Sequence, residues 1–435
     1  MTQELVDAEY AALREDLTTY FVGGGRLSVV KAPPGSGKTF TLIEVLSALA
    51  NTGGRIAVAA QTNSQADDIC ERLARDHPEV RVARFSSAGL QAAVSFPEGV
   101  QWVTDKKELP AGPGVTVATT AKWSLTDIGS QYDLLAVDEA WQMSWADLMQ
   151  CATVSEKFLM IGDPGQIPPV VPVDVRRWET SPRAPHLAAP EVVLAEASLA
   201  DVRFVGSLPA CRRLPHESVN FVKPFYDFDF EAYAPAGARG LDVPVGHRWE
   251  SALRGGRPLA LTIPTPAHGP PIEVDHEMAE AVAKVVTALL EAQPTVRSGV
   301  PARPLAQGDI GITSSHRLMN TALAAALGSL SNQIRVDTPE RWQGLERPVM
   351  IAVHPLSGVC DPSAFDLETG RLCVMASRHQ SALILLARDH VGETLRNYVP
   401  SAEQAPGRAD VVGRGHDAHL KFWDQLSAAD CIRAL

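Results

Sequence analysis

The stretch that decides the fold is residues 31–40, KAPPGSGKTF. The apolar residues 27–30 precede it, and residues 39–50 follow it with a helix-like composition. This order of strand, loop and helix is the context that a phosphate-binding P-loop requires. The usual first glycine of the loop is Ala32 here, so the motif is AxxxxGKT. The sequence therefore predicts a nucleoside-triphosphate site on the first strand of an α/β domain.

The chemistry of this loop suits a triphosphate with magnesium. Its glycines let successive backbone N–H groups converge on phosphate oxygens, and the helix N-terminus adds a partial positive charge. Lys38 is expected to reach the β- and γ-phosphates, and the hydroxyl of Thr39 to bind Mg²⁺. The residues expected at the nucleotide are Pro34, Gly35, Ser36, Gly37, Lys38 and Thr39. The alternative is a flexible turn in front of a helix.

A second acidic motif lies at residues 133–142, DLLAVDEAWQ. Its apolar residues predict a buried strand, and the carboxyl end of that strand would present Asp138 and Glu139 beside the P-loop. Asp138 is expected to bind the Mg²⁺ ion, and Glu139 to accept a proton from, or orient, the attacking water. An exposed acidic strand end is the alternative interpretation.

Residues 158–169, FLMIGDPGQIPP, follow at the next predicted strand. Gln166 lies just past the end of that strand, where its amide can contact both the γ-phosphate and the nucleophilic water. A plain Gly-Asp-Pro-Gly turn is the alternative.

The composition is that of an ordinary globular protein, with 435 residues, 45% hydrophobic and 21% charged. This length allows two domains, each with its own core. No apolar stretch approaches the ~18–20 residues that a membrane span needs. The N-terminal residues MTQELVDAEY do not resemble a secretory signal, so we expect a cytoplasmic protein that does not enter a membrane.

The six cysteines are far apart in the sequence and form no pair at zinc spacing, so we expect buried, reduced thiols and no zinc site. The formal net charge is −12, whereas proteins that wrap duplex DNA are normally basic. Any nucleic-acid contact must therefore follow a local track.

Alternating apolar strands and helical segments predict βαβ units with parallel sheets covered by helices. The strands expected in the first half are residues 27–30, 56–60, 80–85, 115–118, 134–137 and 158–161. The second half is expected to contain helices at 277–290, 394–398 and 419–426 and strands at 310–313, 335–337, 349–354 and 382–387. The Pro/Ala-rich residues 181–190 are read as an exposed connection, which suggests a domain boundary near residue 200.

The order of these motifs resembles that of superfamily 1 helicases, nearest to the superfamily 1B group of Upf1-like and Dna2-like ATPases. The resemblance runs from about residue 27 to residue 390. It implies two tandem RecA-like domains, each a mostly parallel sheet flanked by helices, over residues 1–200 and 201–435.

Residue by residue, the resemblance places further roles on this chain. It assigns arginine fingers, which stabilise charge on the γ-phosphate, to Arg212 and Arg378. It directs Gln343, Gly344 and Glu346 toward the nucleotide. The residues that it assigns to the nucleic-acid backbone are Gln61, Thr62, Asn63, Thr119, Thr120 and Thr338.

The function implied is an ATP- and Mg²⁺-dependent helicase or translocase on single-stranded nucleic acid. DNA is favoured over RNA because nothing in the chain reads a 2′-hydroxyl, and the resemblance implies 5′→3′ movement. Short spacings between motifs leave little room for strand-splitting insertions, so unwinding or loading could need a protein partner. Two alternatives stay open, namely an NTP-hydrolysing switch or scaffold subunit, and a nucleic-acid-binding module with residual ATPase activity.

Some residues depart from the family pattern or have two interpretations. Cys211 stands where relatives carry an aromatic residue for the base, and no glutamine lies about twenty residues before the P-loop. Base selectivity is therefore open. The basic pair Arg212 and Arg213 offers phosphate contacts, although such pairs are usually solvated surface. Trp123 and Trp342 border nucleic-acid motifs, where bases could stack on them, but buried core indoles are the favoured explanation.

Overall fold

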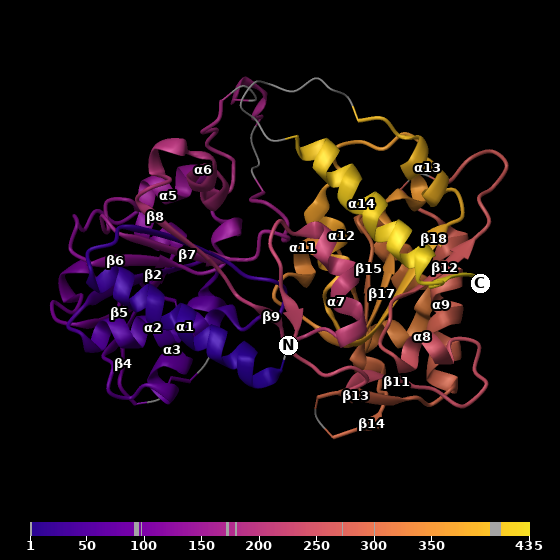
Figure 1. Ribbon diagram of the computed structural model, residues 1–435, viewed down its shortest axis with the longest axis horizontal. Helices are drawn as coiled ribbons and strands as arrows, with labels where there is room; N and C mark the ends of the chain where they lie inside the picture. The colour runs from indigo at the N-terminus through magenta and orange to yellow at the C-terminus, as the bar shows by residue number, and fades with distance from the viewer. Residues whose placement is uncertain are drawn as a thin grey trace. The chain divides into compact units, whose positions relative to one another are not determined.

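Figure 1 shows the computed structural model, which describes residues 2–90, 95–96, 98–170, 174–178, 181–271, 273–299, 301–400 and 410–435. The described chain divides into two compact units. The first comprises residues up to 164 and residues 168–209, and the second comprises residues 165–167 and those from 210 onward. Each unit is built on a parallel sheet, so the predicted fold class of two tandem RecA-like α/β domains is confirmed.

The first unit contains an eight-stranded sheet with the order β4-β3-β5-β2-β6-β7-β1-β8, in which all neighbours are parallel. Its strands are β1 Leu27–Lys31, β2 Arg55–Ala60, β3 Val82–Phe85, β4 Val100–Val103, β5 Gly114–Thr119, β6 Leu134–Val137, β7 Phe158–Gly162 and β8 Arg203–Ser207. All six predicted strands are present. Continuous apolar runs identify them because strands of a parallel sheet are buried on both faces.

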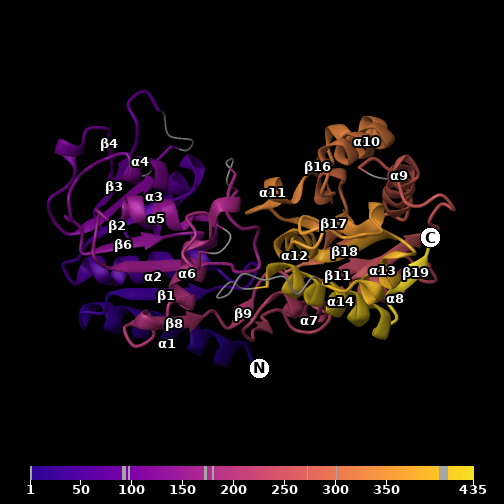
Figure 2. The same ribbon diagram turned by 90° about the horizontal axis from the view of Figure 1, so that it is seen from above.

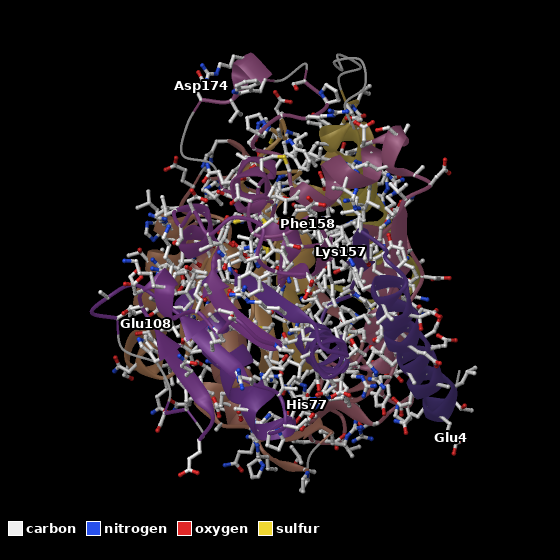
Figure 3. The ribbon with its side chains drawn as sticks, turned by 90° about the vertical axis from the view of Figure 1, so that its left-hand side faces the viewer. Glu4, His77, Glu108, Lys157, Phe158 and Asp174 are labelled. Carbon is white, nitrogen blue, oxygen red and sulfur yellow. The ribbon has the colours of Figure 1, made fainter. Side chains whose placement is uncertain are left out.

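Helices cover both faces of this sheet. They are α1 Gln3–Val22, α2 Lys38–Asn51, α3 Asn63–Asp76, α4 Thr120–Ser124, α5 Trp145–Cys151 and α6 Ala189–Ala195. Figure 1 shows α1 beside α2, and α5 beside α6 farther from them. Figure 3 looks onto this unit and labels Lys157 and Phe158, where β7 begins. Because all neighbouring strands are parallel to β7, their carboxyl ends lie together at the end of the sheet opposite to Phe158.

The first unit differs from the prediction in its first helix and in the two outermost strands of its sheet. The helix α1 and the strands β4 and β8 were not predicted, because their sequences are more polar than the inner strands. The strand β8 pairs with β1 and extends the unit to residue 209, beyond the boundary expected near residue 200. The interpretation of residues 181–190 as an exposed connection is wrong. Ala184, Ala188 and Ala189 are buried, and the carbonyl of Leu187 accepts a hydrogen bond from the backbone of Trp145 at the start of α5.

The second unit contains a six-stranded parallel sheet with the order β16-β15-β17-β18-β12-β19. Its strands are β12 Leu259–Ile263, β15 Ile310–Thr313, β16 Arg335–Asp337, β17 Arg347–Val353, β18 His379–Arg388 and β19 Ile432–Ala434. Two small sheets accompany it. They contain β9 Ala210–Cys211 with β10 Glu231–Ala232, and β11 Arg239–Asp242 with β13 Thr295–Ser298 and β14 Arg303–Pro304.

Two helical layers enclose this second sheet. Its helices are α7 His216–Val222, α8 Glu250–Arg254, α9 His276–Glu291, α10 Arg317–Leu327, α11 Pro339–Trp342, α12 Thr369–Ala376, α13 Val391–Asn397 and α14 Val411–Ala428. Figure 2 shows α9 and α10 on one side and α13 and α14 on the other. Two separate apolar clusters, one on each face, form the core between these layers.

The predicted strands and helices of the second half are all present, and β15 and β16 have the predicted bounds. The strand β12 was missed, although it lies inside the sheet, because its short run follows a Gly-Arg-Pro turn. Five cysteines are buried as expected, but Cys360 is exposed. Within the described ranges, no helix has the length and apolarity needed to cross a membrane.

The two tryptophans that border predicted nucleic-acid motifs are core residues, as favoured from the sequence. Trp123 and Trp342 are both fully buried. The indole N–H of Trp123 donates to the carbonyl of Val58 at 2.8 Å, and that of Trp342 donates to the carbonyl of Ile312 at 3.1 Å. Their rings are therefore not available for stacking on bases.

Candidate functional site

The P-loop of the first unit connects β1 to α2. Gly35 and Gly37 have φ values of 61° and 83°, a left-handed conformation that glycine adopts without strain, and Lys38 begins α2. Ala32, which replaces the usual glycine, is buried, and its N–H donates to the carbonyl of Gly162 in β7 at 2.8 Å. Ala32 therefore continues the strand pairing into the loop, and its methyl group is accommodated in the core.

The helix α1 supports this loop. Tyr10 is buried, and its hydroxyl donates to the carbonyl of Ser36 at 2.7 Å. This contact links the N-terminal helix to the backbone that would hold phosphates. The sequence carried no signal for it, because the two residues are 26 positions apart and Tyr10 belongs to no motif.

The two acidic residues that follow β6 have different surroundings. Asp138 is buried, and its pKa is raised to about 7, mainly by burial and also by the charge of Glu139, against an opposing effect of Lys38. A divalent cation would stabilise the ionised form of this carboxylate. Asp138 together with the nearby helix start at Lys38 and Thr39 therefore fits a magnesium site.

Glu139 forms an ion pair with Lys38, with 3.2 Å between Nζ and Oε1. Its other oxygen, Oε2, is buried and has no hydrogen-bond partner among the described residues. The backbone of Glu139 has a φ of 51°, which is unusual for a residue other than glycine and costs roughly 1–3 kcal/mol. Such strain is typical of a functional site. The side chain of Glu139 reaches Lys38 at the start of α2, the helix that follows the P-loop.

Gln166 lies four residues beyond the end of β7, in the short segment 165–167 that belongs to the second unit. In that unit, Gly370 in α12 is so close that a β-carbon added there would lie 2.6 Å from the carbonyl oxygen of Gln166. The amide of Gln343 donates to the carbonyl of Ile167 at 3.4 Å. Gln166, although it directly follows the first sheet in sequence, therefore packs with the second unit. The chain leaves the first sheet after residue 164 and returns at residue 168.

The residues assigned to nucleic acid in the first unit lie together at the carboxyl ends of β2 and β5. Ala60 is in register with Thr119 across these two parallel strands, so residues 61–63 and 119–120 are neighbours. Gln61 is half-buried, and its amide nitrogen has no hydrogen-bond partner within the described part of the chain. These side chains lie on the same edge of the sheet as the P-loop and Asp138.

Several of these side chains also support the fold. Thr62 caps α3 in a reciprocal capping box, and Thr119 caps α4. The amide oxygen of Asn63 accepts from Arg84 at 2.9 Å, and Arg84 also forms a fully buried ion pair with Asp67. The hydroxyl of Thr120 is buried and points to the carbonyl of Ala60. In this unit Gln61 is therefore the nucleic-acid candidate with the fewest structural duties.

The second unit gathers a group of charged residues at the amino ends of β17 and β18. Arg347 and His379 are paired in register at the start of these strands, and they directly follow Glu346 and Arg378. The backbone N–H of Arg347 donates to the carbonyl of Arg378 at 2.9 Å. Glu346 and the predicted finger Arg378 are therefore brought together by strand pairing.

The other predicted finger, Arg212, lies with its guanidinium 3.9 Å from the ring centre of Tyr233. Its neighbour Arg213 is turned toward Glu346, with which it forms an ion pair. Cys211 is fully buried and therefore does not present a surface to a base. Thr338 lies at the opposite end of the strands, after β16. It is the N-cap residue of α11, but within the described residues its side chain makes no capping hydrogen bond.

Comparisons with known proteins identify several that are similar to this chain. Residues 14–187 match the AAA domain family. The "DNA replication ATP-dependent helicase/nuclease DNA2" of Gallus gallus is 26% identical over 158 residues, which are 33% of this chain and 15% of that protein. The "Regulator of nonsense transcripts 1 homolog" of Neurospora crassa is 32% identical over 111 residues, which are 24% of this chain and 10% of that protein.

The chain thus spans about a sixth or less of the length of these curated relatives. Among solved structures, the arterivirus nonstructural protein 10 helicase aligns with a TM-score of 0.44 and 17% identity, over 83% of this chain and 59% of that one. The AAA domain match and the two relatives agree with the motif order. They support the resemblance of this chain to the superfamily 1B helicase group.

Proposed function

We propose that this protein hydrolyses ATP with Mg²⁺ and uses the energy to move along single-stranded nucleic acid. The observation that carries the proposal is the group formed by Lys38, Asp138 and Glu139 beside a left-handed glycine loop. It combines a cation for phosphates, a buried carboxylate for a metal ion and a second carboxylate for a proton.

Residues of the first unit, together with Gln166 of the second unit, would act in sequence on the bound triphosphate. The backbone of residues 34–37 and Lys38 hold the phosphates, which draws Lys38 away from Glu139. Thr39 and Asp138 hold Mg²⁺, which neutralises charge on the phosphate oxygens when it is bound. Glu139 then accepts a proton from the attacking water, with Gln166 orienting that water.

The second unit would supply the cations that the reaction needs. Arg212 and Arg378 would stabilise charge on the γ-phosphate, an effect worth ~10³–10⁵ in rate for arginine fingers. Gln343, Gly344 and Glu346 would contact the nucleotide. Because the phosphate-binding loop and the two arginines belong to different units, hydrolysis requires the units to close on ATP and to part again.

Movement follows if each unit holds the strand through its own contacts. Gln61, Thr62, Asn63, Thr119 and Thr120 would contact the backbone from the first unit, and Thr338 from the second. These are uncharged groups, as expected for an acidic chain that follows a single strand locally. We favour DNA over RNA and 5′→3′ movement, with a protein partner for duplex unwinding.

The test is the rate of ATP hydrolysis with and without a single-stranded oligonucleotide. Stimulation by the oligonucleotide, together with loss of hydrolysis in Lys38→Ala, supports the proposal. A rate that ignores DNA and RNA but responds to a protein partner would instead indicate a switch subunit. Strand displacement on substrates with 5′ or 3′ tails then distinguishes a translocase that unwinds from one that does not and reports its polarity.

A further inference from the structure

A cavity of about 270 Å³ lies at the carboxyl ends of β15 and β17 in the second unit. Ser314, the first residue after β15, and Val353, the last residue of β17, both line it. This volume is just below the ~300–1,000 Å³ of typical small-molecule sites, so it suits one flat ring better than a whole nucleotide. Because Glu346 and Arg378 precede β17 and β18, the cavity lies at the opposite end of the strands from them.

The cavity adjoins Thr338, the residue of this unit that is predicted to contact nucleic acid. Thr313 in β15 is in register with Asp337 in β16 and with Ala352 in β17. The residues that follow this row lie side by side at one end of three neighbouring strands, and they are Thr338, Ser314 and Val353. Neighbouring strands are about 4.7–4.9 Å apart, so Thr338 is roughly one strand spacing from the cavity wall.

An aromatic pair forms part of this wall. The ring centres of His316 and Phe365 are 5.6 Å apart, with 31° between the ring planes, and both residues line the cavity. Phe365 is 42% exposed, and the guanidinium of Arg371 lies 3.9 Å from its ring centre. These three flat groups lie against one another, an arrangement that a further flat ring can extend. The wall therefore offers a surface on which a nucleobase can stack.

The polar groups of the wall suit the edge of a base better than a phosphate. The hydroxyls of Ser315 and Ser357 are buried and have no hydrogen-bond partner among the described residues. Ser357 is only 4% exposed, so a ligand that bonds its hydroxyl would relieve the cost of leaving it unpaired. In the described part of the chain, the charged residues that line the cavity are all acidic, namely Glu273, Asp275 and Asp366. A phosphate would have no cation in this wall, whereas the edge of a base carries neutral donors and acceptors.

We propose that this cavity holds one base of the single strand, stacked against Phe365 and His316, while the backbone of the strand passes Thr338. The inference rests on the proposed function, because it takes the second unit to hold a strand. It gives this unit a contact with a base in addition to its contact with the backbone. The contact tolerates different bases, because every base has a face that stacks.

The experiment measures the affinity of the full chain for two labelled strands of equal length by fluorescence anisotropy. One is a single-stranded DNA of mixed sequence, and the other is the same sugar–phosphate chain without bases. Phe365→Leu is expected to weaken binding of the first strand roughly 5- to 150-fold, the size of one base stack, and to leave binding of the second unchanged. Ser357→Ala should weaken binding of the first strand by a smaller factor.

Tyr398→Leu is the matched control in the same unit. Tyr398 follows α13 and also lies beside a histidine, with 5.3 Å between its ring centre and that of His416, but it does not line the cavity. This variant should bind both strands like the wild type. The strand without bases separates stacking from a merely structural role, because a damaged unit would bind both strands more weakly.

Equal weakening of both strands in Phe365→Leu, or no weakening of either, overturns the inference. In both cases the proposed function still stands if the DNA strand stimulates ATP hydrolysis by the wild type. A wild type that no strand stimulates contradicts the proposed function, and the inference with it. If circular dichroism shows that Phe365→Leu does not fold, His316→Leu removes the other ring of the pair, and the same difference between the two strands is required.

Discussion

The two units place their predicted functional residues at different edges of similar parallel sheets. In the first unit, the P-loop, Asp138 and the nucleic-acid candidates all follow the carboxyl ends of β1, β6, β2 and β5. In the second unit, Glu346 and Arg378 precede β17 and β18, whereas Thr338 follows β16 at the opposite edge. The residues predicted to contact nucleotide and those predicted to contact the strand are thus adjacent in one unit and separated in the other.

This difference assigns different tasks to the two sheets. The seven residues of β17 span about 20 Å at roughly 3.3 Å per residue, so the charged group and Thr338 are far apart. The chain itself crosses this distance between Thr338 and Glu346, by way of α11 and the buried Trp342. The first unit therefore has both sets of predicted contact residues at one edge, and the second unit contains a segment that connects two edges.

The largest expected effect tests the ion pair at the edge of the first unit. In Glu139→Gln, kcat should fall about 10²–10⁴-fold because the proton acceptor is lost. ATP should bind at least as tightly, because Lys38 no longer has to leave a carboxylate for the phosphates. Calorimetric titration and single-turnover hydrolysis measure the two quantities.

The control for this change is Glu156→Gln, an exposed carboxylate of the same unit that pairs with Arg26. It should leave both quantities unchanged. If Glu139→Gln lost ATP binding together with hydrolysis, the ion pair would be needed to shape the site, and the expectation that Lys38 leaves Glu139 when ATP binds would be contradicted.

A smaller effect concerns the proton on Asp138, whose pKa is about 7. Protons compete with Mg²⁺ for this carboxylate, so the apparent affinity for Mg²⁺-ATP should be constant above pH 7 and fall about tenfold per pH unit below it. Because the folded-state pKa lies above the ordinary value, the ligand-free protein should lose stability as pH rises from about 4 to 7.

Titrations of Mg²⁺-ATP at pH 6, 7 and 8 measure this dependence. Asp138→Asn provides the control, since its weaker binding should no longer change through this range. An affinity for Mg²⁺-ATP that stays constant down to pH 6 would show that the metal is held without Asp138.

Much of the fold was predictable because parallel strands are buried on both faces and therefore appear as short apolar runs. The run at 134–137 predicted β6 to the residue, and the Gly-Lys-Thr turn predicted the start of α2 to within one residue. The edge strand β8 was not predictable, because one side of its backbone meets solvent and its residues are mixed. The buried alanines of residues 181–190 were misread, since proline-rich sequence suggests exposure.

The site was predictable only where a motif is continuous in sequence. Lys38, Asp138 and Glu139 belong to such motifs, and the structure brings Lys38 and Glu139 into contact. The partnership of Arg213 with Glu346 spans 133 residues and depends on strand register, which a single sequence does not contain. The left-handed backbone of Glu139 was equally hidden, because glutamate has no preference for that conformation.

The smallest effect compares two tryptophans in equivalent places. Val58 pairs with Val117, and its carbonyl accepts a hydrogen bond from Trp123, which lies six residues after Val117. In the same way, Ile312 pairs with Val336, and its carbonyl accepts a hydrogen bond from Trp342, which lies six residues after Val336. Replacement of either indole by phenylalanine leaves a buried carbonyl without its donor, at a cost of about 1–3 kcal/mol in the free energy of unfolding. Urea denaturation should show similar losses for the two variants.

Their effects on activity should differ, because only Trp342 lies in the segment that connects two edges of its sheet. We expect Trp342→Phe to reduce the stimulation of ATP hydrolysis by a single-stranded oligonucleotide, and Trp123→Phe to leave it unchanged. The basal rate serves as the internal control for both. If the two variants lost stimulation equally, the crossing between Thr338 and Glu346 would carry no coupling. The placement of Thr338 and Glu346 at opposite ends of the strands in the second unit would then serve only the packing of that unit.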